Sequence, residues 1–379
     1  MDYISKMKYL MYAVFFTLIM SSCSLTDASK AIHPVMISHP GVNDGKISEF
    51  SLVQFMDVDG APLEYCLDVD SVNCGDDRCE VIKVRIFWNA LGAYRRLEFP
   101  GGGELTKNGH QVFSEDDYDK LNRILADKNS ALKTFNPGSL AAAGRADDVD
   151  ALTAPTPLFY QTSVVRGAVF TSYTLWHWVN GNITEQIRSV TAQSCKHEHL
   201  MRYVNNASVD LFNFALEQFA QRGNFENDVI SSVEKRMESE SAEFSESALD
   251  YLETAVAAGR KDVYCKTLPA LFGKGSSRKR ILCLRSLADV QENMPGWFYD
   301  EMALYLPELD SFFEVHLLLS ILEKQNPDSR YTVSAALKVL SDENFLIARR
   351  AYSFLEKQKL DKQQTAMVKD FRTEFKDRL

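Results

Sequence analysis

The stretch DENFLIARRAYSFLE, residues 342–356, decides how the C-terminal half of the chain folds. Leu346, Tyr352 and Leu355 form its predicted apolar stripe, and polar residues stand between them. A stripe of this kind predicts an amphipathic α-helix that buries one side and leaves the other in water.

Related patterns recur on the N-terminal side of this stretch. Leu268, Leu304 and Leu340 return about every 36 residues, and so do Leu284, Leu319 and Leu355. The two series interleave and give one helix about every 18 residues, which is the rhythm of a helical-hairpin solenoid. From about residue 192 to the end the pattern resembles HEAT repeats, and an irregular helical bundle is the alternative.

The preceding part of the chain has the period of two that is typical of strands. Ile82, Val84, Ile86 and Trp88 point one way, and Lys83 and Arg85 point the other way together with Val81 and Phe87. Asp59-Gly60 is a hairpin-turn signal between two apolar runs. Residues 48 to about 100 are therefore predicted to be a β-meander, and Ser114 is predicted to cap a helix with three acids in its first turn. The predicted strands are Leu52–Asp57, Leu63–Val69, Val81–Trp88 and Tyr94–Phe99.

The N-terminus has the order of a secretory signal: Lys6 and Lys8, a short apolar run, and small residues before Cys23. The sequence LIMSSC at residues 18–23 resembles the lipobox of bacterial lipoproteins, with Met20 in place of the usual Leu. The resemblance implies that Cys23 receives diacylglycerol and becomes the first mature residue, palmitoylated and tethered in the cell envelope. Ser24 after it points to the outer membrane, facing the periplasm. An ordinary secretory signal with an incidental Cys is the alternative.

The segment DALTAPT at residues 150–156 resembles the flavin-attachment motif of FMN-binding domains, in which the last Thr is joined to FMN. The matching positions are Asp150, Thr153 and the acceptor Thr156. Ala154 and Pro155 depart from the family's Gly-Ala, since Pro removes an N–H donor and restricts the residue before it. A Pro-containing loop between core elements is the alternative.

The predicted fold class follows: an α+β N-terminal domain with an antiparallel β-meander and helices, then an all-α HEAT-like domain. The predicted borders are a signal peptide at 1–22, a tether at 23–47, an FMN-binding-like domain at 48–191 and helical repeats at 192–379.

Six cysteines remain after Cys23, an even set that is compatible with disulfides in an exported protein. Cys74 and Cys79 are near neighbours in a turn-like segment and are the best candidate pair. Cys265 and Cys283 lie on adjacent predicted helices, where they either pair or pack as buried thiols.

The remaining chemistry-bearing residues give no complete constellation. The net charge of −10 argues against binding to nucleic acid. Cys195 and His199 have the i, i+4 spacing of a metal pair but lack further ligands, and His177 between two tryptophans is interpreted as a core histidine. No catalytic residue and no metal site are predicted. The two functional hypotheses are a non-catalytic envelope scaffold that binds a protein through its repeats, and an FMN-binding-like accessory of electron transfer.

We predict that Cys23→Ser abolishes lipid attachment, because only a thiol accepts the diacylglycerol. Incorporation of labelled palmitate should be lost, and the protein should leave the membrane fraction. An unchanged membrane fraction for Cys23→Ser would contradict the lipoprotein prediction.

Overall fold

The computed structural model describes residues 29–40, 45–72, 81–107, 110–134, 162–237, 242–290, 293–327 and 329–379. The chain divides into two compact units, the front unit (Met1–Lys196) and the helical unit (His197–Leu379). The predicted border after residue 191 falls inside the last helix of the front unit. The predicted fold class is confirmed, since a five-stranded antiparallel sheet with helices precedes a long run of helices.

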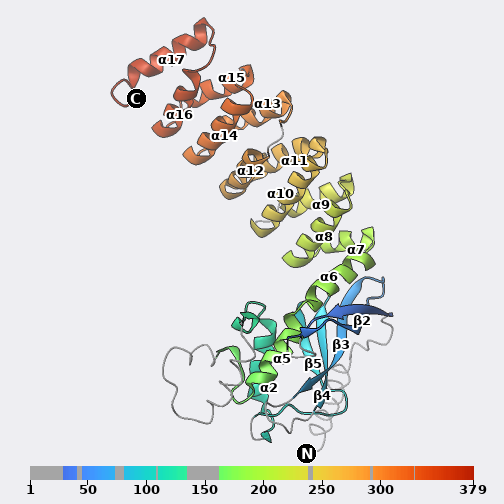
Figure 1. Cartoon of the computed structure of the whole chain (residues 1–379). Helices are drawn as coiled ribbons and strands as arrows, with labels where there is room; N and C mark the ends of the chain where they lie inside the picture. Colours follow the sequence, from blue (N-terminus) through green and yellow to red (C-terminus); the bar gives the residue numbers. More distant parts are fainter. Residues whose placement is uncertain are drawn as a thin grey trace, which may run out of the picture. The chain divides into compact units, whose positions relative to one another are not determined.

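The sheet of the front unit is a meander in the order β1-β2-β3-β4-β5, and every neighbouring pair is antiparallel (Figure 1). Its last four strands correspond to the four predicted ones. The strands are β1 (Lys30–Ile37), β2 (Ser48–Met56), β3 (Pro62–Val72), β4 (Val81–Asn89) and β5 (Tyr94–Glu98).

Strand β1 corrects the prediction that residues 23–47 form an irregular tether. It pairs with β2 along its whole length, from Lys30 opposite Phe55 to Ile37 opposite Ser48. Val35 and Ile37 are buried, so the segment has the period of two expected of a half-buried strand. Pro34 conceals this pattern in the sequence, but an edge strand tolerates a proline because one of its sides needs no ladder hydrogen bond.

One face of the sheet is covered by helices α2 (Glu115–Ala126), α5 (Val169–Asn180) and α6 (Ile183–Ser194). The predicted inward side chains of β4 are all buried there, and the Trp88 indole donates to the Val179 carbonyl of α5 at 2.9 Å. Ser114 caps α2 as predicted, in a capping box with Asp117. A short 3-10 helix, η3 (Ala131–Thr134), follows α2.

The helical unit is a stack of helix pairs in two layers (Figure 1). Helices α8, α10, α12, α14 and α16 pack in succession in one layer, and α7, α9, α11, α13 and α15 do so in the other. This succession favours the predicted repeat array over an irregular bundle. The helices are α7 (His197–Val204), α8 (Val209–Gln221), α9 (Asn227–Met237), α10 (Ala242–Ala257), α11 (Lys261–Lys274), α12 (Ser277–Asp289), α13 (Gly296–Leu304), α14 (Phe312–Gln325), α15 (Arg330–Val339), α16 (Phe345–Leu355) and α17 (Lys362–Glu374), with the 3-10 helix η4 (Leu306–Glu308) after α13.

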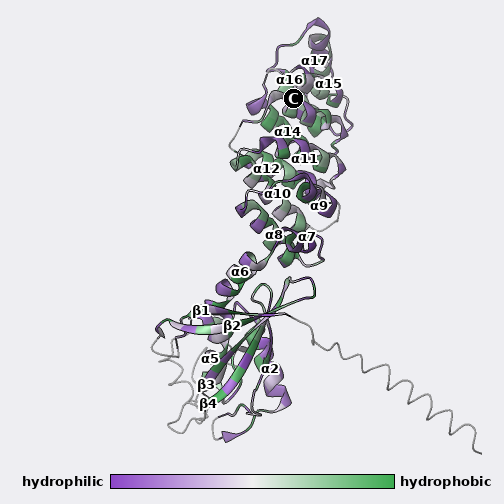
Figure 2. Ribbon diagram, turned by 90° about the vertical axis from the view of Figure 1, so that its right-hand side faces the viewer, coloured by the Kyte–Doolittle hydropathy of each residue, from purple (hydrophilic) through white to green (hydrophobic). Residues whose placement is uncertain are grey.

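Most of the repeating leucines lie in the core between the layers, and hydrophobic and hydrophilic residues alternate around each helix (Figure 2). Two predicted core positions are wrong. Leu304 is 59% exposed at the end of α13, and Leu346 is 48% exposed in the first turn of α16. The buried face of α16 is formed instead by Ile347, Ala348, Ala351, Tyr352, Phe354 and Leu355.

The turn between β4 and β5 requires glycine at position 92, where α6 approaches closely. Gly92 has φ of 80°, and a Cβ there would lie 3.1 Å from the Thr184 carbonyl oxygen. Gly60, in the hairpin between β2 and β3, also has φ of 80° but has no atom within 4 Å of such a Cβ. The two glycines therefore share a backbone conformation, but only Gly60 has room for a Cβ atom.

We predict that Gly92→Ala destabilises the front unit more than Gly60→Ala does. Both substitutions incur the cost of about 1–2 kcal/mol for a left-handed L-residue, and only the first also pushes against α6, which adds about 1–3 kcal/mol. Urea unfolding of the two variants measures the difference. Equal losses would show that α6 does not pack on this turn.

Candidate functional site

Six of the candidate site residues lie outside the described residues: Cys23, Cys74, Cys79, Asp150, Thr153 and Thr156. Lipidation at Cys23, a Cys74–Cys79 disulfide and FMN on Thr156 therefore stay predictions.

Cys265 and Cys283 are free, which corrects their nomination as a disulfide pair and leaves the alternative of buried thiols. Burial raises the pKa of Cys265 to about 11 and that of Cys283 to about 12. The Cys265 thiol lies 3.6 Å from the sulfur of Met294. Both thiols are protonated at neutral pH and fill the core as small apolar groups.

His177 takes part in a buried aromatic cluster of the front unit, as its interpretation as a core histidine requires. Its Nε2 lies 3.2 Å from the Leu132 carbonyl, and the ring of His39 lies 6.1 Å away. His39 stacks on Trp178 at 4.5 Å and donates to the Thr174 carbonyl at 2.9 Å. Desolvation lowers the pKa of both histidines, so both rings are neutral at pH 7.

A chain of hydrogen-bonded polar side chains also crosses the sheet. Thr191 of α6 donates to the Ala90 carbonyl at 2.6 Å and accepts from the Tyr65 hydroxyl at 2.7 Å. The Tyr65 oxygen accepts from the Gln54 amide at 2.9 Å, and the Gln54 carbonyl accepts from His33 at 2.8 Å. The donors run in one direction from β1 to α6, so this chain cross-links the strands and the helix.

The metal interpretation gains no support from the described residues. Cys195 is buried at the C-terminal cap of α6, and His199 is buried in α7. Among the residues that the structure describes, no group of three or more His, Cys, Asp or Glu could hold a metal ion. Within the same ranges, no helix has the length and apolar character to cross a membrane.

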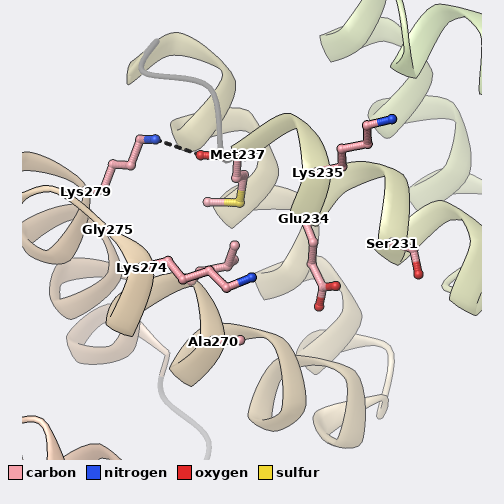
Figure 3. A pocket seen from close by; sticks show the side chains of 9 residues that line it. Ser231, Glu234, Lys235, Met237, Ala270, Lys274, Gly275 and Lys279 are labelled. Atoms are coloured by element: carbon pink, nitrogen blue, oxygen red, sulfur yellow. Dashed lines mark hydrogen bonds between the residues drawn. The ribbon is translucent and has the colours of Figure 1, made fainter.

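A hollow of about 320 Å³ lies between α9, α11 and α12 of the helical unit (Figure 3). The Lys279 ammonium donates to the Met237 carbonyl at 2.7 Å, at the end of α9 where a helix favours a cation. Lys274 and Glu234 point toward one another across the hollow, and Lys235 also lines it (Figure 3). These contacts join neighbouring helices.

Exposed apolar side chains of the helical unit are concentrated on its C-terminal helices. Between residues 162 and 296 the described chain has no exposed large hydrophobic residue, and from Trp297 onward such residues recur. They define two surfaces. The α13–α15 surface consists of Trp297, Leu304 and Tyr331, and the α14–α16 surface consists of Phe312, Phe313 and Leu346.

Two members of each surface occupy equivalent places in successive repeats. Trp297 and Tyr331 lie in the first turns of α13 and α15, and Phe313 and Leu346 lie in the first turns of α14 and α16. These surfaces are not evident from the sequence, because the leucine spacing and the apolar stripe favour burial of Leu304 and Leu346. Aligning the sequence by helix starts would have placed each pair together.

Polar contacts hold the α13–α15 surface in place. The Asp300 carboxylate of α13 accepts from Ser329, the N-cap of α15, at 2.6 Å and from Asn326 at 2.9 Å. The Ser329 hydroxyl in turn accepts from the backbone of Tyr331. The first turns that present Trp297 and Tyr331 are thus tied to one carboxylate.

An ion pair does the same for the α14–α16 surface. Arg350 of α16 donates to both carboxylate oxygens of Glu323 on α14, at 3.3 and 3.0 Å. The Arg350 side chain is 11% exposed and that of Glu323 is 25% exposed, so solvent screens the pair only partly. In both cases a polar contact joins the two helices that carry the exposed apolar side chains.

Comparison with protein-family models, with curated proteins and with solved structures gives no match for this chain. Its function must therefore be inferred from the molecule itself.

We predict that the front unit loses stability as the pH falls from 6.5 toward 4. Burial lowers the pKa of His177 to about 4 and also lowers the pKa of His39. In the unfolded chain, a histidine side chain has a pKa of about 6.5. The neutral histidines contribute their full stabilisation above pH 6.5. By pH 5 the free energy of unfolding should fall by about 1–2 kcal/mol, a figure that allows for the partial exposure of His177.

Urea unfolding at pH 7 and pH 5, followed by tryptophan fluorescence, measures this loss. Trp88, Trp176 and Trp178 report from the front unit. The control is His177→Gln, which keeps a donor for Leu132 and does not titrate, so its pH dependence should be shallower. The same slope in both proteins would contradict the prediction.

Proposed function

We propose that the protein is a lipid-anchored scaffold of the bacterial cell envelope, whose helical unit docks a partner protein without catalysing a reaction. The observation that supports docking is the restriction of exposed large apolar residues in the helical unit to positions from Trp297 onward. Exposed apolar patches on soluble folds are typical of interaction surfaces.

The chemistry of these residues suits a protein partner. Tryptophan and tyrosine are enriched among the residues that dominate binding energy, since they bury a large area with few rotatable bonds. Trp297 is 55% exposed and Tyr331 is 46% exposed, so much of their area is available to a partner. The contacts of Asp300 and Ser329 keep their helix turns fixed, which lowers the entropy lost on binding.

The front unit, under this proposal, separates the anchor from the docking helices. Its buried histidines and the Tyr65–Thr191 chain have structural partners and stabilise its core. Cys23 lies shortly before β1, so a lipid on it would hold the front unit at the membrane surface.

We predict that Trp297→Ala combined with Tyr331→Ala lowers recovery of a defined envelope partner by tenfold or more. Truncating a hot-spot aromatic costs about 2 kcal/mol or more in binding. The measurement is quantitative co-purification from envelope extracts of the host, with circular dichroism to verify helical content.

Val58→Ala combined with Val112→Ala is the matched control, because both side chains are exposed and apolar but belong to the front unit. This variant should retain the partner. Equal loss in both variants, or no loss in the first, would contradict docking through the α13–α15 surface.

The alternative function is an FMN-binding-like accessory of an envelope electron-transfer system, supported by the DALTAPT motif alone. It expects a yellow protein whose flavin absorbance survives denaturation and disappears in Thr156→Ala. A colourless protein purified from its host would leave the scaffold as the proposed function.

A further inference from the structure

A groove of about 490 Å³ lies between α16 and α17 at the C-terminal end of the helical unit. Its floor is aromatic: the rings of Phe345 and Phe375 are 5.3 Å apart, and those of Phe371 and Phe375 are 4.7 Å apart. Met367, which is 43% exposed, lines the same groove. Phe371 is buried in the core, so the apolar surface that the groove offers to a ligand comes from Met367 and from the partly buried Phe345 and Phe375.

The rim of this groove is acidic. Asp342, Glu343, Asp370 and Glu374 line it, and Arg378 is the single basic residue among its lining residues. Within the described residues, no ion pair neutralises any of the four carboxylates. An acidic rim around an apolar floor attracts a ligand that is both basic and apolar.

Arg378 shows how a cation fits this groove. Its guanidinium lies 3.9 Å from the centre of the Phe345 ring and 5.9 Å from that of Phe375. A guanidinium over an aromatic face is stabilised by the ring's quadrupole, and the nearby carboxylates add to the attraction. The residue follows α17, and its backbone donates to the Phe375 carbonyl at 2.9 Å.

We propose that this groove binds a short, basic, amphipathic segment of a partner protein, with an arginine taking the place of Arg378. Apolar side chains of the segment would cover Met367 and Phe375 while its cations meet Asp370 and Glu374. This is the helix-in-groove mode of recognition, with specificity supplied by charge. The inference rests on the proposed docking function and names the chemistry of the partner.

The chain's own Arg378 competes for this position. Displacing it releases one cation–π contact and replaces it with an equivalent one, so the ligand gains mainly from its apolar contacts and its other charges. Removing Arg378 should therefore tighten binding, which distinguishes a ligand groove from a merely structural contact.

The test measures fluorescence anisotropy of labelled synthetic peptides on the purified full-length chain. The probe is a helical peptide with apolar residues at i, i+3, i+4 and i+7 and with Arg and Lys elsewhere. We expect it to bind, to weaken about tenfold in Asp370→Asn combined with Glu374→Gln, and to tighten about threefold in Arg378→Ala. Added salt should weaken binding, since the rim is exposed.

Two controls make the outcome specific. Glu301→Gln combined with Glu308→Gln, exposed carboxylates outside the groove, should leave the affinity unchanged. A peptide with the same apolar residues and with Glu in place of Arg and Lys should not bind. Equal binding of both peptides, no binding of the basic one, or weaker binding by Arg378→Ala would overturn the proposal.

A second copy of the chain is the competing occupant. Concentration-dependent dimers in analytical ultracentrifugation that dissociate in Asp370→Asn combined with Glu374→Gln would overturn the proposal in favour of self-association. These outcomes concern the groove alone, because docking through Trp297 and Tyr331 is measured separately by co-purification. Failure of the peptide test with retained co-purification leaves the proposed function standing.

Discussion

Burial between two layers of helices is the constraint on which the helical unit depends. In each helix pair, the two helices cover part of one another's apolar surface. The rest of that surface is buried only when the next pair stacks on it. The succession α8, α10, α12, α14 and α16 meets this need, and so does the facing layer. Stacking therefore explains why residues such as Phe298 and Leu319, which have no exposed surface, are apolar.

The same constraint leaves the outer turns free of structural demands. Trp297, next to the fully buried Phe298, is 55% exposed, and the part of its side chain that faces water adds no hydrophobic stabilisation to the stack. Stacking of the helices therefore does not explain why large apolar residues are exposed at equivalent helix starts. Docking of a partner protein is the reason that we propose, and the aromatic character of Trp297 and Tyr331 suits that role.

The sequence predicted the elements whose burial follows one simple period. The sequence was enough to predict strands β2 to β5, the cap of α2 and the spacing of the later helices. Period-two and helical patterns each indicate a single buried face. Strand β1 could not be predicted, because a proline such as Pro34 is typical of loops. Its pairing with β2 shows that the proline lies in an edge strand, where it is tolerated. Leu304 and Leu346 are exposed although one stands in a repeating leucine series and the other in an apolar stripe, because both lie at a helix end, where the next layer does not cover the side chain.

The candidate surfaces were harder to predict for the same reason. A sequence shows that Trp297 and Tyr331 are aromatic but not that both lie on the water-facing side of their helices. The state of Cys265 and Cys283 likewise depends on the direction of each side chain. The interpretation of His177 as a core histidine could be made from the sequence, and the ring lies against the Leu132 carbonyl.

Site-specific photo-cross-linking in the native host tests the central claim most directly. A photoreactive amino acid at position 297 should give one cross-linked adduct of defined mass in the envelope fraction. The same amino acid at position 266, exposed on α11 in the same layer of helices, should give none. Absence of an adduct at 297, or the same adduct at both positions, would contradict docking through the C-terminal helices.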